Sequence, residues 1–359
     1  FALISLLEKK DDYNESSLEA VNYSANSTAG KVLRAVLEYS LLNARLQKTE
    51  DDVKWRITTR ELYDETLKKE IHDSFILLGW FMWNFIYLDR DWTLKHVQRF
   101  YDLTDEYWNG FIGGILFTKP IRDEAIHKIL KPHYQRLINT ELRANDRSLK
   151  GLPRHLAAQF FWGLEEFEED SLLILFLKRG PIQLIADFIR YIGIQVKYVE
   201  SLKEADEKAG FRAKIESLWR YILNEYGGPE APEALELQAC LPELLRLFDN
   251  VNETLVELTT ASLSNYNKAT TFYARSLYDS LVRFKNNATS EKEASLIYQI
   301  IISSAPTSSR LLYPSKQQTE ELLTYLFESG LIEEANNICD ILFKNGFEFV
   351  NTIFRKYNK

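Results

Sequence analysis

Apolar positions follow the period of an amphipathic helix along most of the chain. Between residues 31 and 48, one such stripe consists of Leu33, Val36, Leu37, Leu41 and Ala44. Other sides of the same segment are also apolar, through Val32, Tyr39, Leu42 and Leu46. The pattern therefore predicts a helix that is packed on more than one side.

Similar periodicity predicts helices over most of the remaining sequence, at about residues 58–73, 75–88, 92–101, 121–138, 184–192, 211–226, 232–260, 262–286, 290–303, 318–329 and 331–345. Asp91 suits the N-cap of the third of these, and Pro120 suits the first position of the fourth. The segment 171–177 has the composition of a strand, but no partner strand is evident, so we expect a helix there too. Only 14 glycines and 9 prolines interrupt these patterns, which predicts an all-α fold.

The length of 359 residues exceeds the roughly 250–300 at which one hydrophobic core stops growing. Turn-forming residues gather between Asn145 and Pro153, so we expect an N-terminal helical subdomain over 1–147 and a helical-repeat subdomain over 148–359. Near the end, the spacing of Leu331, Ala335, Ile338 and Leu342 resembles tetratricopeptide helix pairs. We therefore expect an irregular α-solenoid of antiparallel helix pairs, tetratricopeptide-like at its C-terminal end.

The formal charge of −8 is spread along the chain without basic blocks, which argues against nucleic-acid binding. The longest uncharged run, from Ser74 to Leu88, is shorter than the ~20 residues that a membrane-spanning helix needs. Cys240 and Cys339 stand far apart in apolar patterns, which indicates buried thiols in a reducing compartment and predicts a cytoplasmic protein. The chain starts at Phe1 and has a single methionine, so we expect a fragment of a longer protein.

The search for catalytic, cofactor or metal sites gives no candidate. The five histidines (His72, His96, His127, His133 and His155) lack zinc-ligand spacing, so we interpret them as surface or helix-end residues. Gly30-Lys31 lacks the other residues of a phosphate-binding loop, and Gly110, Gly113 and Gly114 favour a helix break or close helix packing. The acidic run from Glu165 to Asp170 is typical of a solvated face. We therefore expect a protein that is not an enzyme, although a helical enzyme with a dispersed site stays open.

Two sets of residues give further expectations. Four tryptophans in apolar context should be buried between helices of the first third: Trp80, Trp83, Trp92 and Trp108. On the helix expected over 262–286, the stripe containing Leu277, Leu281 and Phe284 should face a neighbouring helix. Lys268, Arg275 and Tyr278 lie off that stripe and could form an outward patch that binds a partner.

Four short segments carry a resemblance to a known family: Asn26-Ser27-Thr28-Ala29-Gly30-Lys31, Asp91-Trp92-Thr93, Trp108-Asn109-Gly110-Phe111, and the helix from Ala335 to Gly346 with the following Phe347 to Arg355. They resemble the C-terminal helical regions of bacterial anti-phage defence proteins, the antiviral STAND ATPases and related sirtuin-domain proteins. Ser27-Thr28 departs from the His-Pro of that family, and residues of about 150–310 match nothing in it.

The resemblance implies a sensor domain. In that family a helical array recognises a phage protein, such as a structural or packaging protein, and triggers an effector that lies N-terminal to it, with oligomerisation of the parent protein on activation. The alternative is a general helical-repeat scaffold that assembles other proteins. Each matching residue also has a structural explanation, since tryptophans and glycines at such positions commonly serve helix packing.

Overall fold

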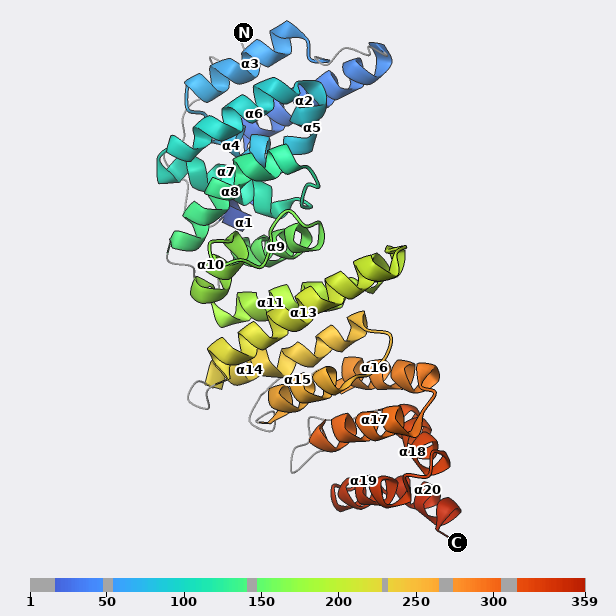
Figure 1. The fold of residues 1–359 in the computed structure, drawn as a ribbon. Helices are drawn as coiled ribbons and strands as arrows, with labels where there is room; N and C mark the ends of the chain where they lie inside the picture. The colour runs from blue at the N-terminus through green and yellow to red at the C-terminus, as the bar shows by residue number, and fades with distance from the viewer. Residues whose placement is uncertain are drawn as a thin grey trace. The chain divides into compact units, whose positions relative to one another are not determined.

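The computed structural model describes residues 17–47, 54–140, 147–227, 232–264, 274–304 and 315–358 (Figure 1). Every regular element in these ranges is a helix, as the sequence predicts. The contacts divide the chain into two compact units, Phe1–Leu184 (unit 1) and Ile185–Lys359 (unit 2). Among the described residues, no helix has both the length and the apolar character that crossing a bilayer requires.

Unit 1 is built from ten α-helices and two short 3₁₀ helices within the described ranges, all in sequence order from the blue to the green part of Figure 1. They are α1 (Ser17–Asn26), α2 (Thr28–Gln47), α3 (Ile57–Lys68), α4 (His72–Trp80), α5 (Met82–Leu88), α6 (Arg90–Arg99), η2 (Phe100–Asp102), α7 (Asp105–Phe117), α8 (Glu124–Asn139), η3 (Arg147–Lys150), α9 (Gly151–Phe161) and α10 (Leu172–Arg179).

The most extensive packing between two helices of unit 1 is the crossing of α4 and α7, where two glycines let the backbones approach closely. A Cβ on Gly114 would lie 2.4 Å from the carbonyl oxygen of Ile76, and one on Gly79 would lie 2.2 Å from that of Phe111. Both glycines are helical and buried, so they serve close approach and not a turn. This confirms close packing, and not a helix break, for the glycine-rich stretch of α7.

Several helix ends differ from their predicted positions. The N-cap of α6 is Asp89, whose carboxylate accepts a hydrogen bond from the Trp92 amide (3.0 Å), so the prediction of Asp91 is wrong by two residues. Helix α8 starts at Glu124 behind the cap Asp123, and Pro120 lies in the preceding connection. In both cases an aspartate that the hydrophobic period does not single out supplies the oxygen that the first amides need.

The division between the units also lies later than the predicted boundary after residue 147. Helix η3 and the start of α9 pack against α7, and a Cβ on Gly151 would lie 1.9 Å from the carbonyl oxygen of Leu116. Ser171 caps α10 as the helix that the sequence predicts, and α10 packs on α8. These contacts place residues 148–184 in unit 1.

Unit 2 continues with helices throughout its described part, including η4, the 3₁₀ helix that interrupts the predicted helix over 232–260. Its elements, together with α11, which straddles the division, are α11 (Ile182–Gly193), α12 (Val196–Ser201), α13 (Ala205–Tyr226), α14 (Pro232–Cys240), η4 (Leu241–Leu247), α15 (Glu253–Leu263), α16 (Ala274–Asn287), α17 (Glu291–Ser304), α18 (Lys316–Glu328), α19 (Ile332–Lys344) and α20 (Val350–Tyr357).

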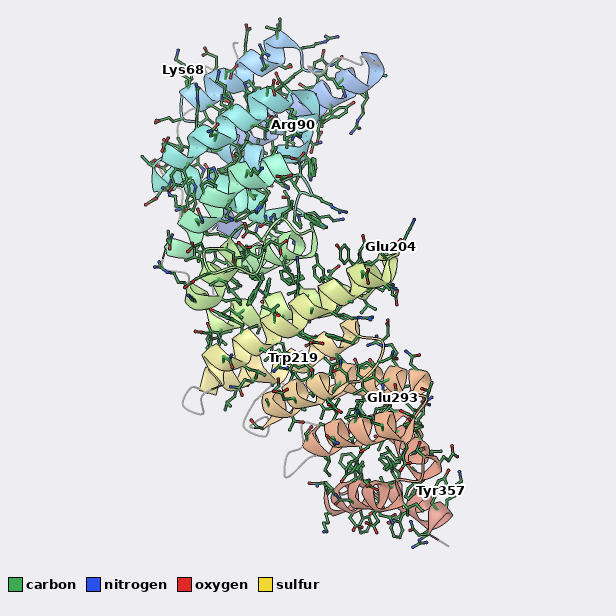
Figure 2. The ribbon with its side chains drawn as sticks, in the orientation of Figure 1. Lys68, Arg90, Glu204, Trp219, Glu293 and Tyr357 are labelled. Atoms are coloured by element: carbon green, nitrogen blue, oxygen red, sulfur yellow. The ribbon has the colours of Figure 1, made fainter. Side chains whose placement is uncertain are left out.

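The helices of unit 2 pack in two series. One series runs α13 on α15, α15 on α17 and α17 on α19, and the other runs η4 on α16, α16 on α18 and α18 on α20. Trp219 of α13, labelled in Figure 2, is fully buried and donates from its indole Nε1 to the hydroxyl of Ser262 on α15 (2.8 Å). Ala335, Ile338 and Leu342 of α19 are buried, as their spacing predicts.

Candidate functional site

The patch predicted on residues 262–286 does not form as expected. Tyr278 is only 3% exposed, so it faces the interior. Its helix, α16, packs on η4, α17 and α18 together, which buries a wider arc than the single predicted stripe of Leu277, Leu281 and Phe284. Lys268 and the side chain of Arg275 lie outside the described residues. Tyr278 is therefore a packing residue and not part of an outward patch.

Exposed apolar side chains gather instead on unit 1, beginning with α2. Its buried side consists of Leu33, Leu37, Leu41 and Ala44, as predicted. The expectation of packing on further sides is wrong for three residues, because Tyr39, Leu42 and Leu46 are 50%, 56% and 71% exposed. With exposed Ala35 they stand at the i, i+4, i+7, i+11 spacing of one helical strip. An aliphatic strip open to solvent is unusual for a helix whose opposite face already fills a core.

The segment that enters α3 joins this strip to α5. The amide of Lys54 donates to the carbonyl oxygen of Leu88 at the end of α5 (2.7 Å). Two residues later, Arg56 Nη1 donates to the hydroxyl of Tyr39 on α2 (3.3 Å), and the next residue, Ile57, is 63% exposed. The backbone of this segment therefore lies between α2 and α5 and adds an aliphatic side chain to the same surface.

Helix α5 adds two aromatic rings. Trp83 is 45% exposed and Tyr87 is 40% exposed, and they stand one turn apart on the same side of the helix. The ammonium of Lys54 lies 4.5 Å from the centre of the Tyr87 ring. The predicted burial is therefore wrong for Trp83, holds for Trp92 and Trp108, and is only partial for Trp80. We call the surface formed by Tyr39, Leu42, Leu46, Ile57, Trp83 and Tyr87 the α2–α5 face.

A buried aromatic cluster holds the α2–α5 face in place. Trp55 is 4% exposed and lies 4.9 Å from Trp92 and 5.5 Å from both Tyr63 and Phe85, measured between ring centres. Its indole donates to the Ser40 hydroxyl of α2 (3.2 Å). These contacts fix the segment 54–57 against α2, α3, α5 and α6, so the exposed side chains stand on a rigid support.

The charged groups beside the face are mostly cationic. Helix α2, residues 54–57 and α5 together contain one carboxylate, Glu38, which pairs with Arg34 (2.9 Å). Their remaining charged side chains are Lys31, Arg45, Lys54 and Arg56. Among the described residues, none of these four pairs with a carboxylate. These three described segments thus contain five cationic side chains and one carboxylate, whereas the whole chain has a net charge of −8.

An open pocket of about 360 Å³ adjoins the exposed strip of α2. Ala35 belongs both to the strip and to the pocket wall, and Lys31, Arg34 and Trp80 are among the other lining residues. The guanidinium of Arg34 lies 5.9 Å from the centres of the Trp80 and Phe81 rings. The pocket therefore combines an aromatic wall with Lys31 and the Arg34–Glu38 ion pair beside the apolar strip.

The segment Asn26–Lys31 that carries the family resemblance has a structural role here. The Ser27 hydroxyl accepts from the Gly30 amide (2.8 Å) and donates to the Asp73 carboxylate (2.7 Å), so it caps α2 and ties it to α4. A Cβ on Gly30 would lie 1.9 Å from the Ser24 carbonyl oxygen, so only glycine permits this joint of α1 and α2. Trp108 and Phe111, from another matching segment, are buried core residues.

Four of the five histidines are buried. Their interpretation as surface or helix-end residues is wrong for His127, His133 and His155, which lie inside α8 and α9, whereas His72 is the first residue of α4. The Trp108 indole donates to His133 Nδ1 (3.0 Å), while His133 Nε2 donates to the Val97 carbonyl oxygen (3.0 Å). His155 is held in the same way between the Tyr134 hydroxyl (2.8 Å) and the Thr118 carbonyl oxygen (3.0 Å). Burial lowers the pKa of both histidines to about 4, so each is neutral at pH 7.

Glu165 differs most from its predicted place on a solvated face. It is 2% exposed and receives hydrogen bonds from His127 Nε2 (2.9 Å), Lys131 Nζ (2.7 Å) and the Leu172 amide (3.0 Å). Burial alone would raise the pKa of Glu165, but these donors outweigh it and hold the pKa below its usual value. The carboxylate thus anchors the loop between α9 and α10 to α8.

The two cysteines and the possible metal ligands complete the reactive groups of the described residues. Cys240 and Cys339 are buried free thiols, and burial raises the pKa of each to about 11. For Cys240 this outweighs the nearby Arg190, whose Nη2 lies 3.3 Å from the sulfur. The described part of the chain contains no group of three or more His, Cys, Asp or Glu side chains placed to hold a metal ion.

Comparisons of the chain with protein-family models, with curated proteins and with solved structures found no match.

Proposed function

We propose that this chain recognises another protein and does so through the α2–α5 face. The observation that carries the proposal is the exposure of six large apolar side chains on one rigid support, with Lys54 and Arg56 in contact with two of them. Contiguous exposed apolar patches with polar rims are typical of protein interaction sites. Trp, Tyr and Arg are also the residues that most often dominate binding energy at interfaces.

The architecture of unit 2 supports a helical-repeat protein. Polar contacts join helices of one series at nearly constant separation: Arg220 with Glu257 (37 residues apart) and Asn337 with Tyr298 (39 apart). The other series does the same, with Arg283 to the Leu245 carbonyl oxygen (38 apart) and Lys285 with Glu321 (36 apart). A recurring distance of one helix pair is expected of an α-solenoid, and we propose that fold for unit 2.

We further propose that the chain is the sensor region of a bacterial anti-phage defence protein. Here the support is the sequence resemblance, of which three of the four segments lie in unit 1, the unit that carries the α2–α5 face, and the longest lies in unit 2. In this proposal, a phage structural or packaging protein binds the face in the cytoplasm. The bound state is then signalled to an N-terminal effector, with oligomerisation of the parent protein. The chain itself binds without catalysing a reaction.

The same face would serve a general scaffold for cellular proteins, and one experiment separates the two. The parent protein is co-expressed with individual phage structural and packaging proteins, and the growth arrest or enzyme activation that follows is measured. Wild type is compared with Leu42→Ser/Leu46→Ser, and with Ile194→Ser, which removes an equally exposed aliphatic side chain (52%) from unit 2.

A defence sensor predicts activation by at least one phage protein, retained in Ile194→Ser and lost in Leu42→Ser/Leu46→Ser. Stable capture of host proteins in uninfected cells, with no response to any phage protein, would favour the scaffold. Equal activation of all three proteins would overturn the assignment of the α2–α5 face.

A further inference from the structure

We propose that the α2–α5 face takes an acidic amphipathic helix, that is, a protein segment with apolar side chains on one side and carboxylates along its flanks. The inference rests on the proposed function and adds the chemistry of the partner. It follows from the kind of side chains that the face exposes, from the cations beside them that pair with no carboxylate among the described residues, and from the length of the exposed strip.

The two cations of the segment 54–57, Lys54 and Arg56, contact tyrosine side chains and no carboxylate in the described part of the chain. Lys54 lies over Tyr87, and Arg56 donates to the Tyr39 hydroxyl while remaining exposed itself. A ring or a hydroxyl leaves most of the hydrogen-bonding capacity of a cation unused. Lys54 and Arg56 can therefore form ion pairs with carboxylates of a partner from fixed positions between α2 and α5.

The aliphatic centre of the face selects against a nucleic acid. Leu46, Ile57 and Leu42 are the most exposed large apolar residues of the face, at 71%, 63% and 56%. Single-stranded nucleic acids bind by stacking on aromatic rings along a continuous cationic groove, and aliphatic side chains cannot stack. Apolar side chains of a protein segment match this centre better.

The strip on α2 fixes the length of the segment. From Ala35 to Leu46 the helix rises about 17 Å, at ~1.5 Å per residue, which corresponds to three turns. A partner helix of that length would present apolar residues at the same i, i+4, i+7, i+11 spacing. Cationic residues flank the strip, with Arg45 along α2 and Arg56 beside Tyr39. This arrangement favours carboxylates along the flanks of the bound helix.

The test uses fluorescein-labelled probes and the whole chain. The first probe is an 18-residue helical peptide of Leu and Glu with its leucines on one face. The second replaces every Glu by Lys, the third keeps Glu and replaces every Leu by Ser, and the fourth is an oligouridine of equal charge to the first. Binding is followed by anisotropy, and contact with the face is followed by the change in tryptophan emission that Trp83→Phe should remove.

We expect the first peptide to bind and the other three probes to bind at least tenfold more weakly. Lys54→Glu/Arg56→Glu should weaken the first peptide by tenfold or more. The control, Lys68→Glu/Lys69→Glu, makes the same charge change at the far end of α3, where Lys68 is labelled in Figure 2, and should leave binding unchanged.

The inference is overturned if the first peptide does not bind, if the Lys peptide or the oligouridine binds as well, or if both charge reversals weaken binding equally. These results differ from a failure of the proposed function. Activation by a phage protein could be lost in Leu42→Ser/Leu46→Ser while the peptides show no preference for carboxylates. The face would then still be a protein-binding surface, with a partner of another chemistry.

Discussion

Replacing Gly114 by alanine should destabilise unit 1, although alanine is the better helix former. Gly114 lies inside α7, where the helix propensity of alanine alone would stabilise by ~1 kcal/mol. The added Cβ, however, would lie 2.4 Å from the Ile76 carbonyl oxygen and 2.6 Å from the Trp80 amide nitrogen. Both of these atoms belong to the backbone of α4, so no side-chain rotation can relieve the overlap.

The magnitude follows from the two opposing effects. Overpacking a closely packed core typically costs ~1–3 kcal/mol and sometimes more, and a backbone neighbour puts this site at the upper end. After subtraction of the propensity gain, we expect a net loss of about 2 kcal/mol. For a unit of this size that lowers the melting temperature by roughly 4–8 °C.

The control for this prediction is Gly210→Ala on α13. A Cβ at Gly210 would have no atom within 4 Å, and the glycine is exposed within a helix. The substitution should therefore stabilise by about 0.5–1 kcal/mol through helix propensity alone. Urea unfolding of the two variants, with peptide-resolved hydrogen exchange to assign each effect to its unit, gives the comparison. A Gly114→Ala variant as stable as wild type would refute the close crossing of α4 and α7.

Three further predictions concern the buried polar groups and the tryptophans of unit 1. The pKa of His133 and of His155 is about 4 in the folded protein and 6.5 in the unfolded chain. The contribution of each neutral histidine to the free energy of unfolding is therefore complete above pH 6.5 and is lost as the pH falls toward 4. Unfolding at pH 5 should therefore cost about 2 kcal/mol less per histidine than at pH 7, in unit 1 alone. Glu165→Ala should lower the free energy of unfolding by roughly 3 kcal/mol, because it removes the acceptor of three donors. A variant as stable as wild type in denaturant would show that the Glu165 carboxylate does not anchor the loop. Trp108→Ala should lose ~3–5 kcal/mol, whereas Trp83→Ala should change stability by less than ~0.5 kcal/mol; equal melting temperatures would show that the two tryptophans have been misplaced.

Helical periodicity identifies the helices well because it depends only on the alternation of apolar and polar positions. It predicts α2 and α19 with most of their buried residues, since each has a clear apolar stripe. It misses the break at Phe81, because that break lies in a run that is apolar on every side. In such runs no polar position marks where one helix ends and the next begins. It also misses the 3₁₀ helix η4, which has Pro242 near its start.

Burial of individual side chains is less predictable, because it depends on neighbours that are distant in the sequence. Leu42 and Trp83 have the same residue types as core positions, yet no other described element covers them. Tyr278 is buried because α16 meets three neighbours, and Glu165 is buried because His127 and Lys131 supply its donors from α8. Only the fold brings these groups together, so the candidate site could not be located from the sequence.

Photo-crosslinking from the α2–α5 face tests the central claim most directly. A photoreactive amino acid replaces Leu42 in one form of the parent protein and Ile194 in another, both at exposed aliphatic positions. The proteins are irradiated with the phage protein that activates them, and the crosslinked product is identified by mass spectrometry. The account predicts a crosslink to that protein from position 42 and none from position 194. A crosslink from position 194 alone, or none from either with activation intact, would contradict it.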